Sequence, residues 1–213
     1  MAHTYLGPAY RIESEHLVIR CYNPKDAFYL QKSVQESVEH LRPWLAWVKD
    51  EPEELKVKIE RLRMFRAKFD LSENYIYGVF DSNETELVGG TGLHPRVGSN
   101  AFEIGYWINV NHVNKGYATE ISAALTKVAF EIENVNRVEI HCDPNNFSSI
   151  AIPKKLGYIY EATLRSRTEN SDGEPSDSMI WSIFREDYLK SPAATVKIKA
   201  YDVLGNLIIS KFE

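Results

Sequence analysis

The sequence predicts an α+β protein with a mixed, mostly antiparallel sheet and flanking helices. Residues 102–124 carry the main evidence, because they read as a strand, a short polar turn and a helix. A further strand pattern follows at residues 137–142, and the order strand–helix–strand makes these two strands parallel. Turn-forming residues at 81–84 join two other strand patterns as an antiparallel hairpin.

Composition limits the classes of function. The chain has 213 residues, which is enough for one domain or one domain with a small addition. Its 25 basic and 30 acidic side chains give a formal charge of −5, whereas nucleic-acid binding needs a basic face. No stretch approaches the ~20 apolar residues of a membrane span, and no signal-peptide run is present. Because two cysteines are too few for a disulfide framework, we expect a cytoplasmic protein without membrane or nucleic-acid partners.

Apolar periodicity and turn residues place the elements of the N-terminal half. They are a loose arm at residues 1–10, a strand at 11–22, helices at 24–38 and 52–69, and the two strands of a hairpin at 75–80 and 86–94. The charged face of the second helix, which includes Lys58, is expected to be solvated. Gly89, Gly90 and Gly92 indicate a bulge or a close backbone approach in the last strand.

The C-terminal half continues the alternation of strands and helices. Its elements are a strand at residues 102–110, a helix at 117–132, a strand at 137–142 and a helix at 148–156 that is ended by Gly157. Two more strands follow at residues 158–167 and 178–185. The globular domain is therefore expected over residues 11–190. Residues 191–213 predict one extra β-hairpin. An isolated hairpin is marginal in water, so it should pack on this domain's sheet edge or on that of a second copy, which would make a homodimer.

The turn before the central helix is a candidate anion site. Residues 113–118 contain Gly116 and lead directly into the helix. The first N–H groups of a helix have no intrahelical acceptor, and the helix dipole adds roughly half a positive charge there. This arrangement favours a phosphate or pyrophosphate.

Three sets of residues resemble motifs of the GNAT superfamily of N-acetyltransferases. They are Gly105-Tyr106-Trp107-Ile108, the run from Asn114 to Glu120, and Asn146-Phe147-Ser148-Ser149 with Lys155-Leu156-Gly157-Tyr158. In the superfamily's acyl-CoA motif, Gln/Arg-x-x-Gly-x-Gly/Ala, Gly116 and Ala118 match and Val113 stands where Gln or Arg is usual. Residues 11–190 are most similar to the Rim-type group that acetylates ribosomal-protein N-termini, with further markers at residues 16–20 and 40–47.

The resemblance implies a GNAT fold and acetyl-CoA as the co-substrate. In that fold the sheet splays between its fourth and fifth strands, here residues 102–110 and 137–142, and the pantetheine arm inserts between them. The implied cofactor contacts are Ile108, Asn109, Val110, Asn114, Lys115, Gly116, Tyr117, Ala118, Thr119, Asn146 and Lys155. A backbone N–H near residues 108–110 would polarise the acetyl carbonyl. No metal is expected, because His141 and Cys142 are adjacent on a strand and point to opposite faces.

Two residues are candidate catalytic groups. Glu103 is the candidate base, acting through a water, and its alternative role is that of a solvent-facing strand residue. An α-amine with a pKa near ~8 needs little help at neutral pH, whereas a lysine near ~10.4 needs much more. Ser149 is placed by the resemblance near the thioester sulfur, where it would protonate or stabilise the thiolate, or else it sits in the first turn of a helix. Cys142 is a covalent acetyl carrier or, as is commoner, a core thiol.

The aromatic stretch at residues 40–47 has two compatible interpretations. Either its tryptophans anchor a helix–helix junction, or His40, Trp44 and Trp47 form one wall of a substrate pocket. The leading functional hypothesis is transfer of an acetyl group from acetyl-CoA to a primary amine, most simply a protein N-terminal α-amine. The alternatives are the same chemistry on a small-molecule amine or antibiotic, and a non-catalytic acyl-CoA-binding module.

Overall fold

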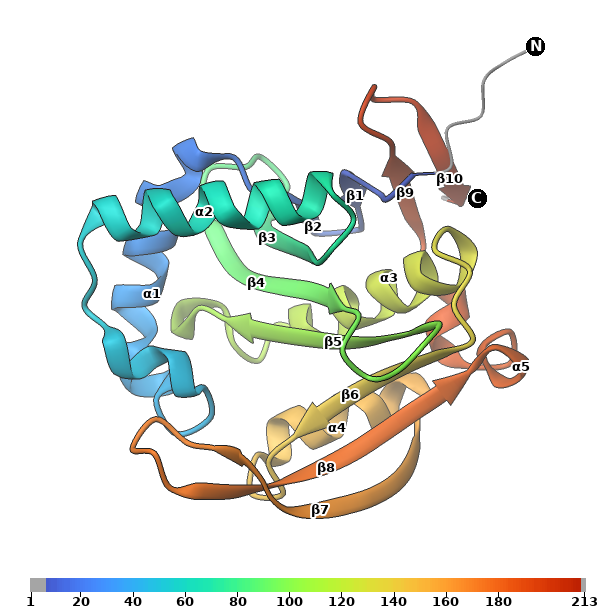
Figure 1. The fold of residues 1–213 in the computed structure, drawn as a ribbon. Helices are drawn as coiled ribbons and strands as arrows, with labels where there is room; N and C mark the ends of the chain where they lie inside the picture. The colour runs from blue at the N-terminus through green and yellow to red at the C-terminus, as the bar shows by residue number, and fades with distance from the viewer. Residues whose placement is uncertain (1–6, 212–213) are drawn as a thin grey trace.

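One mixed sheet of ten strands forms the centre of the molecule (Figure 1). The structure is a computed structural model and describes residues 7–211. The strands lie in the order β10-β9-β1-β2-β3-β4-β5-β6-β8-β7. Their bounds are β1 Arg11–Glu13, β2 Leu17–Cys21, β3 Tyr75–Asp81, β4 Leu87–His94, β5 Ala101–Ile108, β6 Arg137–Cys142, β7 Ile159–Glu169, β8 Pro175–Phe184, β9 Ile198–Tyr201 and β10 Leu207–Lys211. The predicted α+β class with a C-terminal hairpin is confirmed.

Helices cover both faces of this sheet (Figure 1). The α-helices are α1 Ala27–Leu41, α2 Leu55–Asp70, α3 Tyr117–Glu131, α4 Phe147–Leu156 and α5 Arg185–Tyr188, and short 3₁₀ turns include η2 Ala46–Asp50 and η3 Val110–His112. Helices α3 and α4 pack with Ile104 and Tyr106 of β5 in the larger apolar core. Helices α1 and α2 pack on the opposite face, in a smaller core that includes Trp107. Side chains of β5 therefore alternate between two distinct environments, as the period of a strand requires.

The parallel pair β5–β6 separates partway along its length. Its register runs only from Ala101 opposite Arg137 to Glu103 opposite Glu139. Every other strand pair in the described sheet is antiparallel. The predicted parallel crossover is confirmed, and so is the splay, because the ladder stops while both strands continue for several residues.

A bulge lies next to the crowded glycines of β4. The register of β3 with β4 shifts between Val79 and Phe80, as the glycine pattern predicted. A Cβ atom on Gly89 would lie 2.2 Å from the carbonyl oxygen of Trp107, and one on Gly90 would lie 2.5 Å from the indole nitrogen of the same residue. These contacts are closer than real Cβ atoms approach backbone, so only glycine lets β4 lie against Trp107.

Three local expectations differ from the structure. The predicted strand at 11–22 is two short antiparallel strands, β1 and β2, because the chain turns back between Glu13 and Leu17. The first strand of the hairpin predicted over residues 191–213 begins only at Ile198, after a 3₁₀ turn over Pro192–Thr195. The helix expected from residue 52 begins at Leu55, because the residues before it fold back toward Lys58.

Lys58 itself is buried rather than solvated. Its side chain is 0% exposed and forms ion pairs with Glu51 and, at 2.8 Å, with Glu53. Arg61 closes the cluster by donating at 2.5 Å to both oxygens of Glu53. Helical spacing alone placed Lys58 with its exposed neighbours, because the carboxylates that neutralise it lie in the turn before the helix.

The C-terminal hairpin packs on the sheet edge of its own domain. Strand β9 pairs antiparallel with β1, and β10 with β9. The buried Lys127 of α3 donates to the carbonyl oxygens of Ala194 and Val196, at 3.2 Å and 2.9 Å, which ties the segment before the hairpin to the core. Residues 212–213 of the hairpin, and residues 1–6 of the expected N-terminal arm, lie outside the described residues. Of the described arm residues 7–10, Ala9 is buried and Tyr10 donates its backbone N–H to the carbonyl of Tyr201 at 2.9 Å.

The buried ion cluster generates a stability prediction. Replacing Lys58 by Ala leaves Glu51 buried without its counter-charge, which typically costs about 3–5 kcal/mol. The free energy of unfolding from urea titration should fall by that amount for Lys58→Ala. Lys56→Ala, on the exposed face of the same helix, is the matched control and should change stability by less than about 0.5 kcal/mol. Equal losses in the two variants would contradict the role given to the cluster.

Candidate active site

A large cleft opens where β5 and β6 separate. Its volume is about 1840 Å³, and its lining reaches from the α1–η2 segment across β5 and β6 to α3, α4 and β7. Sites for one small molecule typically measure ~300–1,000 Å³. The cleft is therefore large enough for two reactants at once. Twelve of the sixteen sequence-predicted site residues line it, namely His40, Trp44, Glu103, Ile108, Asn114, Gly116, Tyr117, Ala118, Thr119, Asn146, Ser149 and Lys155.

The anion site predicted before α3 has the expected backbone geometry. Gly116 caps the helix with a left-handed φ of 83°, and Asn114 is also left-handed at 62°. The first intrahelical bond is made by the N–H of Thr119 to the carbonyl of Gly116, at 3.0 Å. The amides of Gly116, Tyr117 and Ala118 precede that bond, at the positive end of the helix dipole. Successive backbone N–H groups in a turn of this kind form concave anion sites.

Val113 does not interrupt this anion site. It lines the cleft and packs against the larger core with Tyr117 and Ala118. An apolar side chain fits that environment, and the backbone amides that follow are unaffected by its identity. The departure from the usual Gln or Arg thus removes a side-chain contact and leaves the helix start intact. Lys115 was also predicted to contact the cofactor. It is exposed, and its Nζ lies 3.4 Å from His112 Nδ1.

Ser149, Tyr106 and Cys142 meet on the α4 side of the cleft. The Tyr106 hydroxyl lies 2.8 Å from Ser149 Oγ, and either can donate. Asn146 caps α4 by accepting the Ser149 N–H at 3.0 Å, so this asparagine orients the serine as well as lining the cleft. Burial raises the pKa of Tyr106 well above its usual value. Both hydroxyls are therefore protonated at neutral pH and can donate hydrogen bonds.

Cys142 is a protonated thiol at neutral pH. Burial raises its pKa to about 11, an effect that the neighbouring Ser149 only partly offsets. A thiolate is the nucleophilic form of cysteine. The environment of Cys142 is thus that of a core thiol beside the cleft.

Four titratable residues, Arg96, Glu103, Glu139 and His141, gather on the other face of the same strands. The buried Glu103 of β5 accepts from Arg96 Nε at 2.8 Å and from Arg96 Nη2 at 2.5 Å. His141 of β6 places Nδ1 3.5 Å from Glu103 Oε2 and Nε2 2.6 Å from Glu139 Oε2. Burial would raise the pKa of Glu103, but the hydrogen bonds from Arg96 outweigh it and hold the pKa below its usual range. Glu103 is thus an anion at neutral pH and a weak base.

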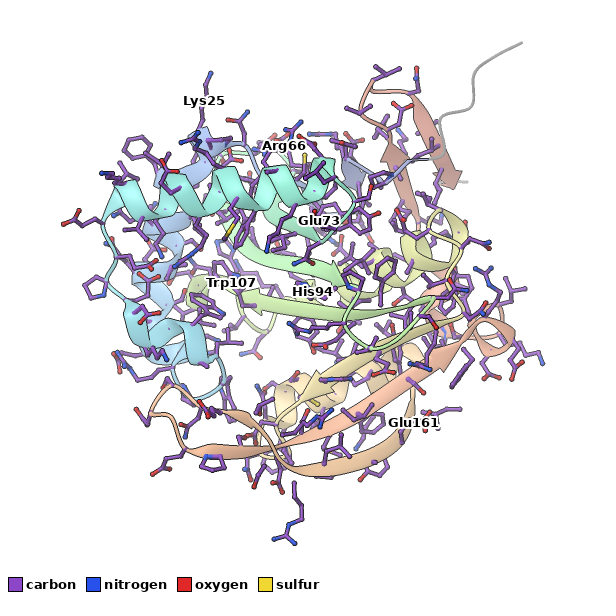
Figure 2. The ribbon with its side chains drawn as sticks, viewed as in Figure 1. Lys25, Arg66, Glu73, His94, Trp107 and Glu161 are labelled. Atoms are coloured by element: carbon purple, nitrogen blue, oxygen red, sulfur yellow. The ribbon has the colours of Figure 1, made fainter. Side chains whose placement is uncertain are left out.

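His94 borders this group without sharing its charge. Burial, with the adjacent Arg96, lowers its pKa to about 4, although Glu103 acts in the opposite direction. Its Nδ1 donates to the side-chain oxygen of Asn74 at 2.8 Å, because that oxygen can only accept. His94 is therefore neutral, and Figure 2 shows it beside the central strands.

The backbone N–H groups of residues 108–110 point in different directions, some to partners within the protein and one to the cleft. Asn109 donates its N–H to the carbonyl of Val88 at 2.8 Å, and Val110 donates to Ser37 Oγ at 3.1 Å. Alternation along the antiparallel ladder turns the N–H of Ile108 away from β4, toward the gap with β6. The Asn109 side chain is buried and donates to Ser33 and Glu36. Among residues 108–110, the Ile108 amide is the one aimed at the cleft.

His40, Trp44, Trp47 and Trp107 form what we call the aromatic wall, which has features of both interpretations of residues 40–47. His40 and Trp44 line the cleft. Trp47 packs edge-on against Trp107 instead, with ring centroids 6.1 Å apart. Trp107 itself lines the cleft and projects toward α1 in Figure 2. Trp47 thus supports the wall from behind.

Sequence reasoning missed Arg96, Glu139, His141 and Tyr106 as site residues. Glu139 and His141 occupy alternate positions of β6, and that spacing puts both on one face. The parallel crossover places this face beside Glu103. The sequence contained that signal, but the register of β5 with β6 was needed to use it. Arg96 lies in a loop, where no periodicity indicates a partner.

A GNAT acetyltransferase domain model matches residues 16–159, which is more than half of the chain. The chain therefore belongs to the GNAT family of N-acetyltransferases. YdaF of Bacillus subtilis, provisionally described as a ribosomal N-acetyltransferase, is 28% identical over 178 residues, 82% of this chain and 94% of that protein. The [ribosomal protein uS5]-alanine N-acetyltransferase of Escherichia coli is 24% identical over 187 residues, 85% of this chain and 94% of that protein. With YnaD of B. subtilis, 29% identity spans only 62% of that protein.

Solved structures share the fold. A crystal structure of a probable acetyltransferase has a TM-score of 0.74 at 26% identity, covering 81% of this chain and 95% of that one. RimJ of Mycobacterium smegmatis, solved in complex with CoA-disulfide, has a TM-score of 0.73 at 22% identity, covering 88% and 90%. Among residues 7–211, no group of three or more His, Cys, Asp or Glu side chains is arranged to hold a metal ion. None of the helices in that range is both long and apolar enough to span a bilayer.

The left-handed cap of α3 generates the second prediction. A non-glycine residue in this conformation costs roughly 1–2 kcal/mol, so Gly116→Ala should shift the first amides of α3 and weaken CoA binding about tenfold. Isothermal titration calorimetry with CoA measures this change.

Gly173 provides the matched control. It has a φ of 80° in the β7–β8 turn, and, as at Gly116, a Cβ atom there meets no neighbour within 4 Å. Gly173→Ala should lose similar stability and keep its CoA affinity. Equal affinities in the two variants would show that the start of α3 does not bind the cofactor.

Proposed function

We propose that this protein transfers the acetyl group of acetyl-CoA to the α-amine of a protein N-terminus, by direct attack of the amine on the thioester. One observation carries the proposal. The gap between β5 and β6 joins three features in one cleft, namely the anion site at Gly116, the hydroxyl pair Ser149–Tyr106 and the carboxylates around His141. The names of the relatives, which describe ribosomal-protein acetylation, support the choice of acceptor.

The residues fit acetyl-CoA in three places. The amides at the start of α3 match a pyrophosphate, which helix N-termini bind well. The unpaired edges of β5 and β6 offer backbone groups to the pantetheine amides, since the ladder between them stops at Glu103. Lys155 at the end of α4 lines the same cleft and adds a cation near the phosphate end. Acetyl-CoA supplies the activated acyl group, and the protein positions the thioester and supplies the polar groups around it.

The Ile108 N–H and the Ser149–Tyr106 pair have separate electrostatic roles in the proposal. The amide of Ile108 hydrogen-bonds the acetyl oxygen as negative charge develops on it, which is the usual function of an oxyanion site. Ser149 Oγ donates to the departing thiolate, and Tyr106 donates to Ser149 to support it. A serine hydroxyl is a weak acid, so this support stabilises the thiolate chiefly by hydrogen bonding.

The acceptor end favours an amine that is only weakly basic. Glu103 and Glu139 attract an ammonium group, while Arg96 and Arg137 balance their charge. An α-amine has a pKa near ~8, and a lysine side chain near ~10.4. Removing one proton at neutral pH is therefore far easier for the α-amine, and the aromatic wall at Trp44 leaves room for the peptide that follows it.

The third prediction tests the proposed reaction directly. The protein is incubated with acetyl-CoA and a panel of acceptors, and free thiol release and acceptor mass are followed. We expect acetylation of peptides with free N-termini and none of the same peptides carrying a blocked N-terminus and an internal lysine. Turnover of small amines alone would reassign the acceptor class. CoA binding without turnover of any acceptor would contradict catalysis.

The fourth prediction tests whether Ser149 and Tyr106 act in the reaction or only in the folded structure. Ser149→Ala removes the donor to the thiolate, and kcat should fall about 10- to 100-fold while KM for acetyl-CoA changes little, since the bond forms mainly in the transition state. Tyr106→Phe should have a smaller effect in the same direction. Ser148→Ala, one position earlier in the first turn of α4 and exposed, is the control. An unchanged kcat in Ser149→Ala would remove Ser149 from the mechanism.

A further inference from the structure

We propose that His141, held by Glu139, is the group that takes the proton from the acceptor ammonium, and that Glu103 serves as the anion that attracts this ammonium. The inference rests on the proposed function, because it concerns the acceptor end of the same reaction. It starts from the spacing of three side chains on one face of β5 and β6, which are Glu103, Glu139 and His141.

The hydrogen bond to Glu139 fixes the tautomer of His141. Nε2 lies 2.6 Å from Glu139 Oε2, and a carboxylate can only accept, so Nε2 carries the proton. The lone pair of the neutral ring is then on Nδ1. A carboxylate that holds one imidazole nitrogen in this way orients the ring and stabilises the imidazolium that forms when the other nitrogen accepts a proton.

The free nitrogen faces the place where an amine would be attracted. Nδ1 lies 3.5 Å from Glu103 Oε2, which is too long for a good hydrogen bond and places two electron-rich atoms side by side. An ammonium satisfies both atoms by donating one N–H to Nδ1 and another to the carboxylate. The His141 side chain is 24% exposed and that of Glu103 is 9% exposed, so the imidazole is the more accessible of the two.

Glu103 is poorly suited to be the base itself. Both of its oxygens accept hydrogen bonds from Arg96, and this pairing favours the ionised carboxylate. Its Oε2 keeps a lone pair for an ammonium, but a proton transferred to it would weaken the contact with the guanidinium. His141 loses nothing comparable on protonation, because the imidazolium then lies between two carboxylates.

The other groups around His141 are consistent with this role. On β6, Arg137 pairs with the second oxygen of Glu139 at 2.7 Å. On the β4 side, His94 is neutral, since burial lowers its pKa to about 4. On β8, the register partner of His141 is the apolar Ile180. On β7, Glu161 is engaged with Ser182. Glu103 and Glu139 are therefore the anions next to the imidazole.

The proton balance of the reaction is complete without another reagent. The ammonium gives one proton to His141 Nδ1, and His141 later releases it to solvent. The neutral amine attacks the carbonyl carbon, a C–N bond forms, and the C–S bond breaks as the thiolate leaves. The amide nitrogen then loses its extra proton, which ends on the thiolate to give the free thiol. Acetyl-CoA and the amine are the only reactants.

The fifth prediction uses pH dependence, which a merely structural role would not alter. For His141→Gln, kcat/KM with an N-terminal peptide should fall about 100-fold at neutral pH, near the lower bound for loss of a general base. The deficit should shrink as pH rises through the amine's own pKa of ~8, because solvent then supplies the neutral amine. It should also shrink for a peptide whose first residue is fluorinated, since that α-amine is already neutral at the assay pH.

Two further variants complete the test. Glu139→Gln should lower the rate less than His141→Gln and move the acidic limb of the pH profile to lower pH, because the imidazolium loses the carboxylate that stabilises it. Glu60→Gln, which is exposed on α2 and paired with Arg63, should behave as wild type. Retained CoA binding in each variant, measured by calorimetry, excludes misfolding. A wild-type rate and pH profile for His141→Gln, with an active wild-type enzyme, would overturn the assignment of His141.

Failure of the proposed function is distinguished by NMR of the imidazole nitrogens, which needs no turnover. The CoA-bound protein should show His141 protonated at Nε2, and Glu139→Gln should weaken that preference. A proton on Nδ1 in the neutral ring would overturn the role of His141 whatever the acceptor. An inactive protein with the expected tautomer would instead contradict acetyl transfer and leave the geometry around His141 supported.

Discussion

The separation of β5 from β6 after Glu103 and Glu139 is the constraint on which the rest of the site depends. A continued ladder would pair every amide of these strands and leave no gap. Because it stops, Ile104–Ile108 and Ile140–Cys142 keep one polar backbone edge open to the cleft. Unpaired buried backbone groups are costly, so the open edges favour a ligand with amides of its own. The crowded glycines of β4 serve the same end, since they let β4 hold β5 from the opposite side.

The alternation of side chains on these two strands divides the chemistry. Even-numbered positions such as Tyr106 and Cys142 face α3 and α4, where Ser149 lies. Odd-numbered positions such as Glu103 and His141 face the α1 and α2 side. In the proposed mechanism, proton removal from the amine and stabilisation of the thiolate therefore fall on opposite faces of one sheet, with the unpaired backbone between them. A period of two residues is sufficient to produce this division.

Sequence patterns predicted the frame of the fold well and the polar network poorly. The strand–turn–helix of residues 102–124, the parallel crossover and the Gly157 helix end follow from local periodicity and turn chemistry, and the structure contains them. Lys58 was misjudged because its partners, Glu51 and Glu53, lie outside the helix whose spacing was read. His141 was weighed only as a metal ligand. Its partners become visible only when the register of β5 with β6 is known, and a one-residue slip would send them to opposite faces.

Glu103 shows why a residue can be placed correctly before its chemical role is understood. Its position on β5 follows from sequence, but its basicity depends on Arg96, a loop residue with no periodic signal. The guanidinium makes the carboxylate a more permanent anion and a worse proton acceptor. The permanent negative charge of Glu103 beside the His141 imidazole attracts a cation. In the proposal, an ammonium bound there also contacts the lone pair of His141 Nδ1. In the proposed mechanism, attraction and deprotonation of the amine therefore fall to two different side chains, Glu103 and His141.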